Sequence, residues 1–216
     1  MKSITLLIIE KDASTISFHF TVTNEIANYF STKEFVISYP EDVSAIPDAV
    51  LAVPFVCNVL PIIWLEDAEL IIPELDEDFY YSIEEVKKGY IAMYPEVEFK
   101  GKLSVGKIIK NTKRNEDGSL ALFSGGVDAT TTLMRHIDDH PLLVTLWGAD
   151  ISYDNVTGWN TVYPTIQALA AEYGVKNTYI HSSFREFDNE EAERLARNIN
   201  MGFTNQHFDD TPDDSE

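Results

Sequence analysis

Cysteine is nearly absent from the sequence: Cys57 is the only one among 216 residues. A single cysteine forms neither an intrachain disulfide nor a cysteine-based zinc cluster, so disulfide-framed and zinc-ribbon domains are excluded. Cys57 lies inside the apolar run "AVLAVPFVCNVLPIIWL". We therefore expect it to be a buried small hydrophobe.

Positive charge is also scarce. The chain has 16 lysines and arginines against 36 aspartates and glutamates, which gives a formal net charge of -20. A field of that sign repels phosphate backbones and anionic membrane surfaces, so autonomous binding to RNA or DNA is disfavoured. Part of the acidity lies in residues 206–216, after the last base, Arg197. We expect this end to be a solvated, disordered tail without a function of its own.

The sequence lacks the signals of membrane insertion and secretion. No window reaches the roughly 18 to 20 consecutive apolar residues of a membrane span, and the amino terminus lacks the basic and apolar regions of a secretory signal. The hydrophobic content of 44% is ample for a packed core. We therefore expect a folded, cytoplasmic protein that does not act on membranes.

A polar stretch divides the chain. Residues 111–120 carry the turn signal Asp117-Gly118-Ser119 between two apolar patterned regions. This places a boundary near residue 115, between an α+β region of unknown role over 1–115 and a second domain over 116–205.

In the first region, the runs "ITLLII" and "TISFHFTVT" are rich in β-branched and aromatic residues and predict an antiparallel hairpin. The run "EFVISY" predicts a further strand, and "EVEFKGKLSVGKII" a closing strand or pair of strands. Residues 47–65 predict a buried helix that Pro54 or Pro61 interrupts or kinks.

One more helix is predicted in the first region, over "SIEEVKKGYIAMY". Ser82 with Glu85 three residues later forms a capping-box pattern that starts a helix. The helical period places four side chains inward: Ile83, Val86, Tyr90 and Met93.

After the boundary, strand and helix patterns alternate. The expected strands are "LALFS", "PLLVTLWG" and "NTYIHSS", and the expected helices are "DATTTLMRHIDD", "TVYPTIQALAAEYGV" and "NEEAERLARNINM". This order predicts an α/β fold, a Rossmann-like parallel sheet with flanking helices. The continuous apolar runs are typical of strands buried on both faces, and Gly174 is well placed as a helix C-terminal cap.

The loop from Ser124 to Asp128 lies between the first of these strands and its helix, where open parallel sheets bind ligands. Gly125 and Gly126 allow positive φ and close approach to the main chain. The N–H groups at a helix amino terminus favour anions, so we expect a phosphate. The hydroxyls of Ser124, Thr130 and Thr131 are further donors. Asp128 is a candidate ligand for a Mg²⁺ ion bound to a polyphosphate.

Two familiar phosphate motifs do not fit. A Walker A loop needs a lysine followed by serine or threonine after its second glycine, and Val127 and Asp128 follow here. A dinucleotide loop needs three spaced glycines, and only an adjacent pair is present.

The segment "FSGGVDAT" resembles the S-G-G-x-D-S signature of the PP-loop ATP pyrophosphatases, or adenine nucleotide α-hydrolases. The resemblance covers residues 120–187 and is closest to the 7-cyano-7-deazaguanine synthase-like and asparagine-synthetase-like branches. It implies a HUP-like domain that binds ATP phosphates on Ser124, Gly125, Gly126, Val127 and Asp128. It also implies adenine near Leu146 and Trp147, and a reaction that transfers AMP to a carboxylate or carbonyl oxygen and releases pyrophosphate.

The chain departs from the family in three respects. Ala129 stands where the last serine of the signature usually lies; Thr130 can compensate only if its side chain, turned by about 100°, still reaches the phosphate. Family members commonly continue well past the third strand. The zinc-binding cysteines of the 7-cyano-7-deazaguanine synthases cannot be present, since Cys57 is the only cysteine.

Other candidate residues have a structural alternative. The segment "LWGADI" is either a ligand-facing loop or a strand-ending turn, and Trp147 either stacks on adenine or packs in the core. After the third strand, Ser182, Ser183 and Arg185 are candidates for substrate or phosphate contacts, Arg185 either gripping phosphate bidentately or forming a surface ion pair. His136 and His140, four residues apart, are metal-ligand candidates if they share one helix face, but we expect Pro141 to end that helix first, so surface positions are favoured.

Two functions remain. The first is an ATP- and Mg²⁺-dependent, ligase-like enzyme that adenylates an unidentified small-molecule acceptor. The second is a catalytically degenerate protein of the same fold that binds nucleotide or works through a protein partner. A nucleic-acid modifier is a third class, but it must overcome the charge of -20.

Overall fold

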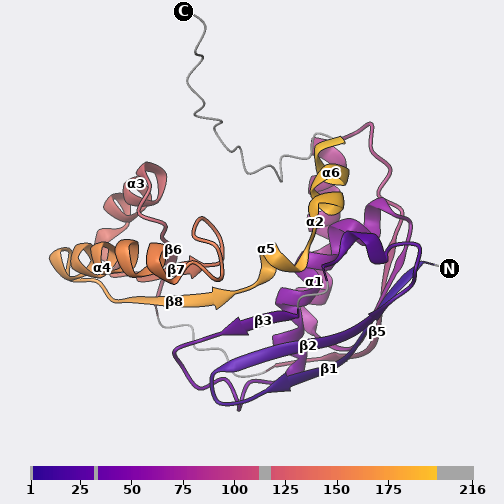
Figure 1. Cartoon of the computed structure of the whole chain (residues 1–216), viewed down its shortest axis with the longest axis horizontal. Helices are drawn as coiled ribbons and strands as arrows, with labels where there is room; N and C mark the ends of the chain where they lie inside the picture. The colour runs from indigo at the N-terminus through magenta and orange to yellow at the C-terminus, as the bar shows by residue number, and fades with distance from the viewer. Residues whose placement is uncertain (1, 32–33, 112–117, 199–216) are drawn as a thin grey trace, which may run out of the picture.

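The computed structural model describes residues 2–31, 34–111 and 118–198, and it shows an α/β protein built on one mixed sheet of eight strands (Figure 1). The strand order is β5-β4-β1-β2-β3-β8-β7-β6. The strands are β1 (Ser3–Lys11), β2 (Thr15–Val22), β3 (Phe35–Ser38), β4 (Glu69–Asp76), β5 (Lys102–Ile109), β6 (Leu120–Leu122), β7 (Leu142–Trp147) and β8 (Asn177–Ser182). The α/β class predicted from the sequence is confirmed.

The first five strands form one half of the sheet. β1 and β2 are antiparallel, which confirms the predicted hairpin, and β3 continues the antiparallel meander. β4 and β5 run parallel to β1 on its other side. The sequence pattern does not indicate β4, because Pro73 and three acidic residues interrupt its apolar run.

The two halves of the sheet meet where β3 pairs with β8. The antiparallel register joins Ile37 to Ser182 and Ser38 to His181. The sheet is therefore continuous through both predicted regions. The predicted boundary near residue 115 and the predicted tail over 206–216 lie outside the described residues, so this division of the chain stays a prediction.

The second half consists of β6, β7 and β8, which are parallel to one another. Helices α3 (Val127–Arg135) and α4 (Val156–Glu172) connect them, as the predicted alternation requires. Leu143 of β7 packs with Ile166 of α4, whereas Leu146 shares a cavity with Pro54 of α1 (Asp48–Leu65). Since side chains alternate along a strand, α4 and α1 cover opposite faces of the sheet.

Helix α1 is the centre of the larger core. It runs unbroken through Pro54 and Pro61, and ten of its side chains are buried, among them Phe55 and Ile63. Phe55 packs with the rings of Phe18 and Phe20 from the sheet. Among the described residues, α1 is the one helix long and apolar enough to cross a membrane, and ten of its side chains are buried in the larger core. The prediction that Cys57 is buried is wrong, since Cys57 is exposed on this helix.

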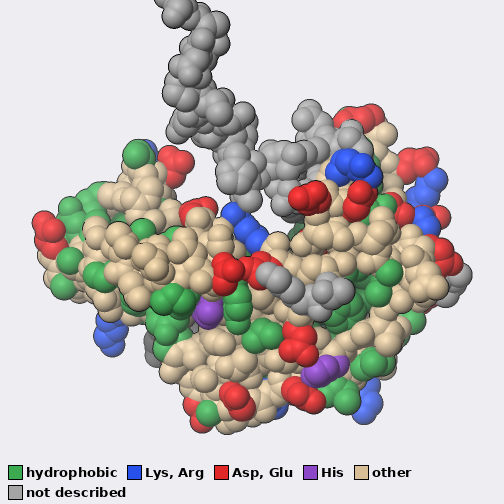
Figure 2. All heavy atoms as spheres, in the orientation of Figure 1, with side chains coloured by type: hydrophobic (Ala, Val, Ile, Leu, Met, Phe, Trp, Pro, Cys, Tyr) green, Lys and Arg blue, Asp and Glu red, His purple; other side chains and the backbone are tan. Residues whose placement is uncertain are grey.

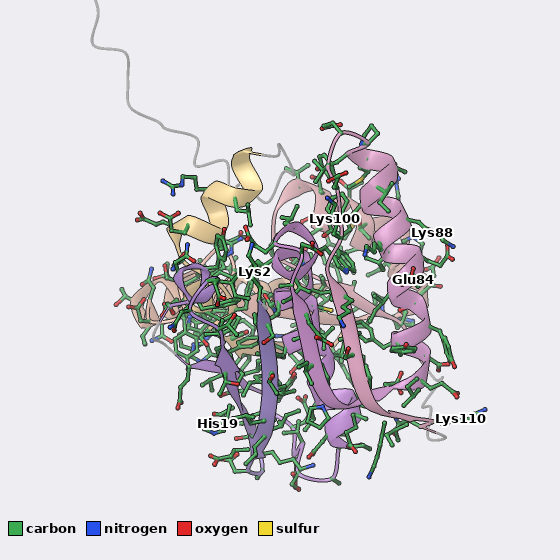
Figure 3. All side chains as sticks on the ribbon, turned by 90° about the vertical axis from the view of Figure 1, so that its right-hand side faces the viewer. Lys2, His19, Glu84, Lys88, Lys100 and Lys110 are labelled. Atoms are coloured by element: carbon green, nitrogen blue, oxygen red, sulfur yellow. The ribbon has the colours of Figure 1, made fainter. Side chains whose placement is uncertain are left out.

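Helix α2 (Glu77–Met93) begins five residues before the predicted start, because the Asp76 carboxylate caps it by accepting from the N–H of Phe79. Ile83 is buried and Tyr90 half-buried, but the inward placement of Val86 and Met93 is wrong: they are 50% and 64% exposed. Only one face of the helix rests on the molecule, and Glu84 and Lys88 project from it into solvent (Figure 3). The helical period of the sequence correctly predicted a helix here. It placed the buried face of that helix wrongly, by part of a turn.

Strand β6 lies at the edge of the sheet and is not buried on both faces as predicted. Leu120 and Leu122 are 63% and 71% exposed. Among the described residues, β6 pairs only with β7. Its apolar sequence therefore resembles that of a central strand although its position is an edge.

A polar network of Lys2, Tyr29 and Glu66 connects the 3-10 turn η1 (Ala27–Tyr29) to the start of β1 and the end of α1. The Tyr29 hydroxyl donates to Glu66 over 2.6 Å, and the Lys2 ammonium donates to the same carboxylate over 2.6 Å. Burial opposes ionisation of Glu66, but the hydrogen bonds from Lys2 and Tyr29 outweigh it and lower its pKa. Burial and the bond to Glu66 raise the pKa of Tyr29 to about 12.

This network predicts a measurable alkaline titration. Because the folded pKa of Tyr29 lies above its ordinary value of 10.0, its stabilising effect is present below that pH and is lost as the pH rises toward about 12. Tyrosinate absorbance should therefore show a late step that Tyr29→Phe removes. Tyr173→Phe, at an exposed position, is the matched control. If Tyr29→Phe instead removed a titration step near the ordinary tyrosine pKa of 10.0, the hydrogen bond from Tyr29 to Glu66 would be absent in solution.

Candidate functional site

The glycine loop leaves the carboxyl end of β6 and enters α3 within five residues, Ser124 to Asp128. Gly125 has φ +84°, a conformation that only glycine adopts without strain. Gly126 is the N-cap residue of α3 and is extended. The chain therefore turns sharply from strand to helix, and the two glycines leave the main chain of the turn uncovered by side chains of their own.

Buried neighbours hold the loop on both sides. Phe123 is buried, its N–H donates to the Val144 carbonyl over 2.8 Å, and its own carbonyl accepts from the Thr145 hydroxyl over 2.8 Å. On the helix side, Leu133 is buried in the same small core. The loop is thus an exposed segment fixed between two anchored elements, as a preorganised binding loop requires.

The amino terminus of α3 is open. Gly126 has no side chain to cap the first N–H groups of the helix, and its own N–H makes only a long bond, 3.4 Å, to the Ser124 hydroxyl. Val127 is 83% exposed, and Asp128 is an exposed acid in the first turn. Uncapped N–H groups attract an anion, whereas the Asp128 carboxylate repels one. A cation between Asp128 and the anion reconciles the two, as Mg²⁺ does in polyphosphate sites.

The threonines and Ala129 lie on different sides of α3. Ala129 packs against the small core with Leu133, so a hydroxyl at this position would face apolar side chains. Thr131 donates to the Val127 carbonyl over 2.8 Å and is turned back on its own helix. Thr130 is half-buried.

Leu146 and Trp147, both predicted near adenine, point to opposite faces of the sheet. Leu146 lines a cavity on the α1 face. Trp147 lies on the α4 face with Trp159 stacked at 4.8 Å on one side and His181 at 3.8 Å on the other. Both faces of the Trp147 ring are therefore occupied, and an adenine can stack on it only by displacing a neighbour.

Trp147 belongs to a column of stacked rings that the sequence analysis did not identify. Tyr153 stacks on His181 at 4.0 Å, and Tyr163 stacks on Trp159 at 4.5 Å. The column also fixes the loop after β7, since Trp147 donates to the Ser152 carbonyl and His181 Nε2 to the Tyr153 carbonyl. These residues are far apart in sequence, but the spacing of aromatic residues on β7, α4 and β8 was a usable signal.

Arg185 contacts the same loop from the other side. Its guanidinium donates to the Ala149 carbonyl over 2.6 Å and lies over the Phe184 ring. Arg185 is exposed and lies in the short helix α5 (Phe184–Phe187). Arg185 thus contacts the loop that follows β7. The sequence predicted either a phosphate contact or a surface ion pair for Arg185, and this contact is neither.

The two serines at the end of β8, Ser182 and Ser183, have different neighbours. Ser183 is buried and bridges to β3, donating to the Glu34 carbonyl and accepting from the Val36 N–H. Ser182 is buried beside the cavity that Leu146 lines.

The two histidines proposed as metal ligands lie apart. His136 pairs with Asp139 at the surface, and α3 ends at Arg135, so His136 and His140 do not share a helix face. Within the described part of the chain, no three His, Cys, Asp or Glu side chains form a metal cluster.

Acidic side chains are spread over the face shown in Figure 2, in keeping with the net charge of -20.

Comparison of the chain with protein-family models, with curated proteins and with solved structures finds no match. The glycine loop, its two anchoring elements and the open start of α3 thus constitute the candidate site on their own geometry.

Proposed function

We propose that this protein is a cytoplasmic, ATP-binding protein of the PP-loop type, with a HUP-like domain formed by β6, β7, β8 and their helices. The observation that carries the proposal is the open strand-to-helix turn at Ser124–Asp128, which combines a left-handed Gly125 with an uncapped helix start. The triphosphate binds the N–H groups of Gly126, Val127 and Asp128.

Mg²⁺ binds between the triphosphate and the carboxylate of Asp128. Nucleotide-bound Mg²⁺ takes one or two protein carboxylates and completes its shell with phosphate oxygens and water, so a single exposed acid fits this role. Ser124 and Thr130 add hydroxyl donors, and Arg185 reaches phosphate only if it leaves the Ala149 carbonyl. The adenine lies at the ends of β7 and β8, beside the aromatic column.

The reaction that this arrangement supports is adenylation. The oxygen of an acceptor carboxylate or carbonyl forms a bond to the α-phosphorus. The bond from that phosphorus to the oxygen bridging the α- and β-phosphates breaks, and its electron pair leaves with pyrophosphate. A nucleophile then displaces AMP from the activated carbon. The loop contributes by positioning the triphosphate and by stabilising its charge.

A second function is favoured by two observations: Ala129 faces the small core, and the β6 edge that leads into the loop is exposed. Both fit a protein that keeps the nucleotide-binding loop but has lost catalysis and acts through a protein partner. This alternative predicts ATP binding without pyrophosphate release.

The test is a calorimetric titration of the full chain with ATP and Mg²⁺. We expect saturable binding with a Kd below about 1 mM, the upper end of the usual range of enzyme KM values. Gly125→Val should weaken it by at least about tenfold, because a β-branched residue does not adopt φ +84° without strain. Gly118→Val, at another positive-φ glycine outside the loop, is the matched control. Absence of binding at millimolar ATP would reject the proposed function.

A further inference from the structure

A cavity of about 320 Å³ lies across the junction of the two halves of the sheet. Its walls include Ile37 and Tyr39 from β3 and the residue after it, Asn58 from α1, and Leu146, Ile180 and Ser182 from β7 and β8. Leu146 and Ser182 belong to the last two residues of their strands. The cavity therefore opens near the carboxyl ends of β7 and β8, where open α/β sheets bind their ligands.

The cavity has a structural cause. β3 and β8 pair over only two register positions, and α1 packs mainly on the first half of the sheet. Leu146 and Ile180 are half-buried on the α1 face, whereas α4 covers the opposite face. The junction thus leaves apolar side chains facing a space that the described part of the chain does not fill.

Three polar groups border this apolar space. Asn58 uses its amide nitrogen to bond the Pro54 carbonyl over 2.8 Å, which leaves its amide oxygen as an acceptor. The Ser182 oxygen accepts from the Phe184 N–H over 3.3 Å, which leaves its hydroxyl hydrogen for a ligand. Burial raises the pKa of Tyr39, so its phenol is a neutral donor. No lysine, arginine, aspartate or glutamate lines the cavity among the described residues.

We propose that this cavity binds a neutral, flat, ring-containing small molecule that carries a carbonyl group. Apolar walls with a few polar groups that fix orientation are typical of small-molecule sites, and the volume suits one or two fused rings. A charged ligand would lose its hydration without gaining an ion pair, and the net charge of -20 further disfavours an anion.

This site also narrows the acceptor, in a step that rests on the proposed function. Of the two acceptor oxygens that adenylation allows, a carboxylate meets no cation in the cavity, whereas a carbonyl oxygen can accept from Ser182 or Tyr39. The acceptor is therefore a ring carbonyl or amide rather than a carboxylate.

The experiment uses the full chain without ATP and follows ligand signals by NMR. The probes are quinazolin-4-one and benzamide, with benzoate as the charged counterpart of benzamide. We expect both neutral probes to bind and benzoate to bind at least about tenfold more weakly. Ile180→Trp, which fills the cavity, should weaken quinazolin-4-one by at least about tenfold. Tyr39→Phe should weaken it by about threefold or more through the lost hydroxyl.

Ile108→Trp is the matched control, because Ile108 is an exposed residue on β5 away from the cavity, and it should bind the probes as the parent protein does. If Ile180→Trp fails to fold, as judged by its thermal transition, Leu146→Phe replaces it. The proposal is overturned if neither neutral probe binds, if benzoate binds as well as benzamide, or if filling the cavity leaves binding unchanged. Probe binding that persists when the ATP titration fails would reject the loop function alone.

Discussion

The Asp128→Ala variant should bind ATP at least about tenfold more weakly than the parent protein when Mg²⁺ is present. Asp128 is the exposed acid in the first turn of α3, beside the uncapped N–H groups. With the metal removed by a chelator, the order should reverse: the variant should bind ATP equally well or up to about fivefold more tightly, because a carboxylate that repels phosphate is gone.

This reversal separates a metal ligand from a residue that merely supports the fold. Asp138→Ala is the matched control, since Asp138 is an exposed acid in the neighbouring turn η2 (Ile137–Asp139) and should leave both affinities unchanged. Thermal melting checks that both variants fold. Equal loss of ATP affinity with and without Mg²⁺ would contradict the metal role.

The largest effect on stability is expected for Gly148→Ala. Gly148 follows β7 with φ +111°, and a Cβ atom there would lie 1.8 Å from the Ser182 carbonyl oxygen. Neither the backbone of β8 nor that of the loop can move away cheaply, because Gly148 is buried and bonds Ile151. We expect the free energy of unfolding to fall by about 3–5 kcal/mol, measured by urea denaturation.

Gly174→Ala is the control for this prediction. Gly174 also has positive φ, at +65°, but nothing lies within 4 Å of its added Cβ. The cost there is the backbone strain alone, about 1–2 kcal/mol. If the two variants lost the same stability, the close approach between the β7 loop and β8 would be absent in solution. That approach matters because the same loop contacts Arg185 and the aromatic column.

Local patterns in the sequence predicted most elements. The β1–β2 hairpin, β3, the apolar helix α1 and the three strand–helix units after residue 118 all follow from periodicity. Gly174 caps α4 as predicted, with its N–H bonded to the Ala171 carbonyl. These features succeed because each depends on residues within one or two turns or strands.

The features that could not be predicted from the sequence depend on contacts between residues far apart in the chain. β4 breaks the strand pattern with Pro73 but is held between β1 and β5. The junction cavity needs the pairing of β3 with β8, which joins residues 37–38 to residues 181–182. No local period signals that pairing, so the cavity could not be found before the fold was known. The aromatic column depends instead on β7, α4 and β8, where the spacing of aromatic residues is visible in the sequence.

The loop and the cavity lie toward the same end of the parallel strands but on different elements. The loop follows the edge strand β6, whereas the cavity lies where β7 and β8 meet β3 and α1. The β7 loop, held by Trp147 and Arg185, comes between them in the strand order. A change at Gly148 is therefore expected to disturb both, whereas Asp128→Ala should leave the cavity intact.

In the function proposed above, the Ser124–Asp128 loop holds the phosphates of ATP with a metal ion on Asp128. The most direct measurement is a crystal structure of the full chain with a non-hydrolysable ATP analogue and Mg²⁺. We expect phosphate oxygens within hydrogen-bond distance of the N–H groups of Gly126 and Val127, and Mg²⁺ bridging the phosphates to Asp128. An empty loop in crystals soaked at saturating analogue, or a nucleotide bound elsewhere on the chain, would contradict it.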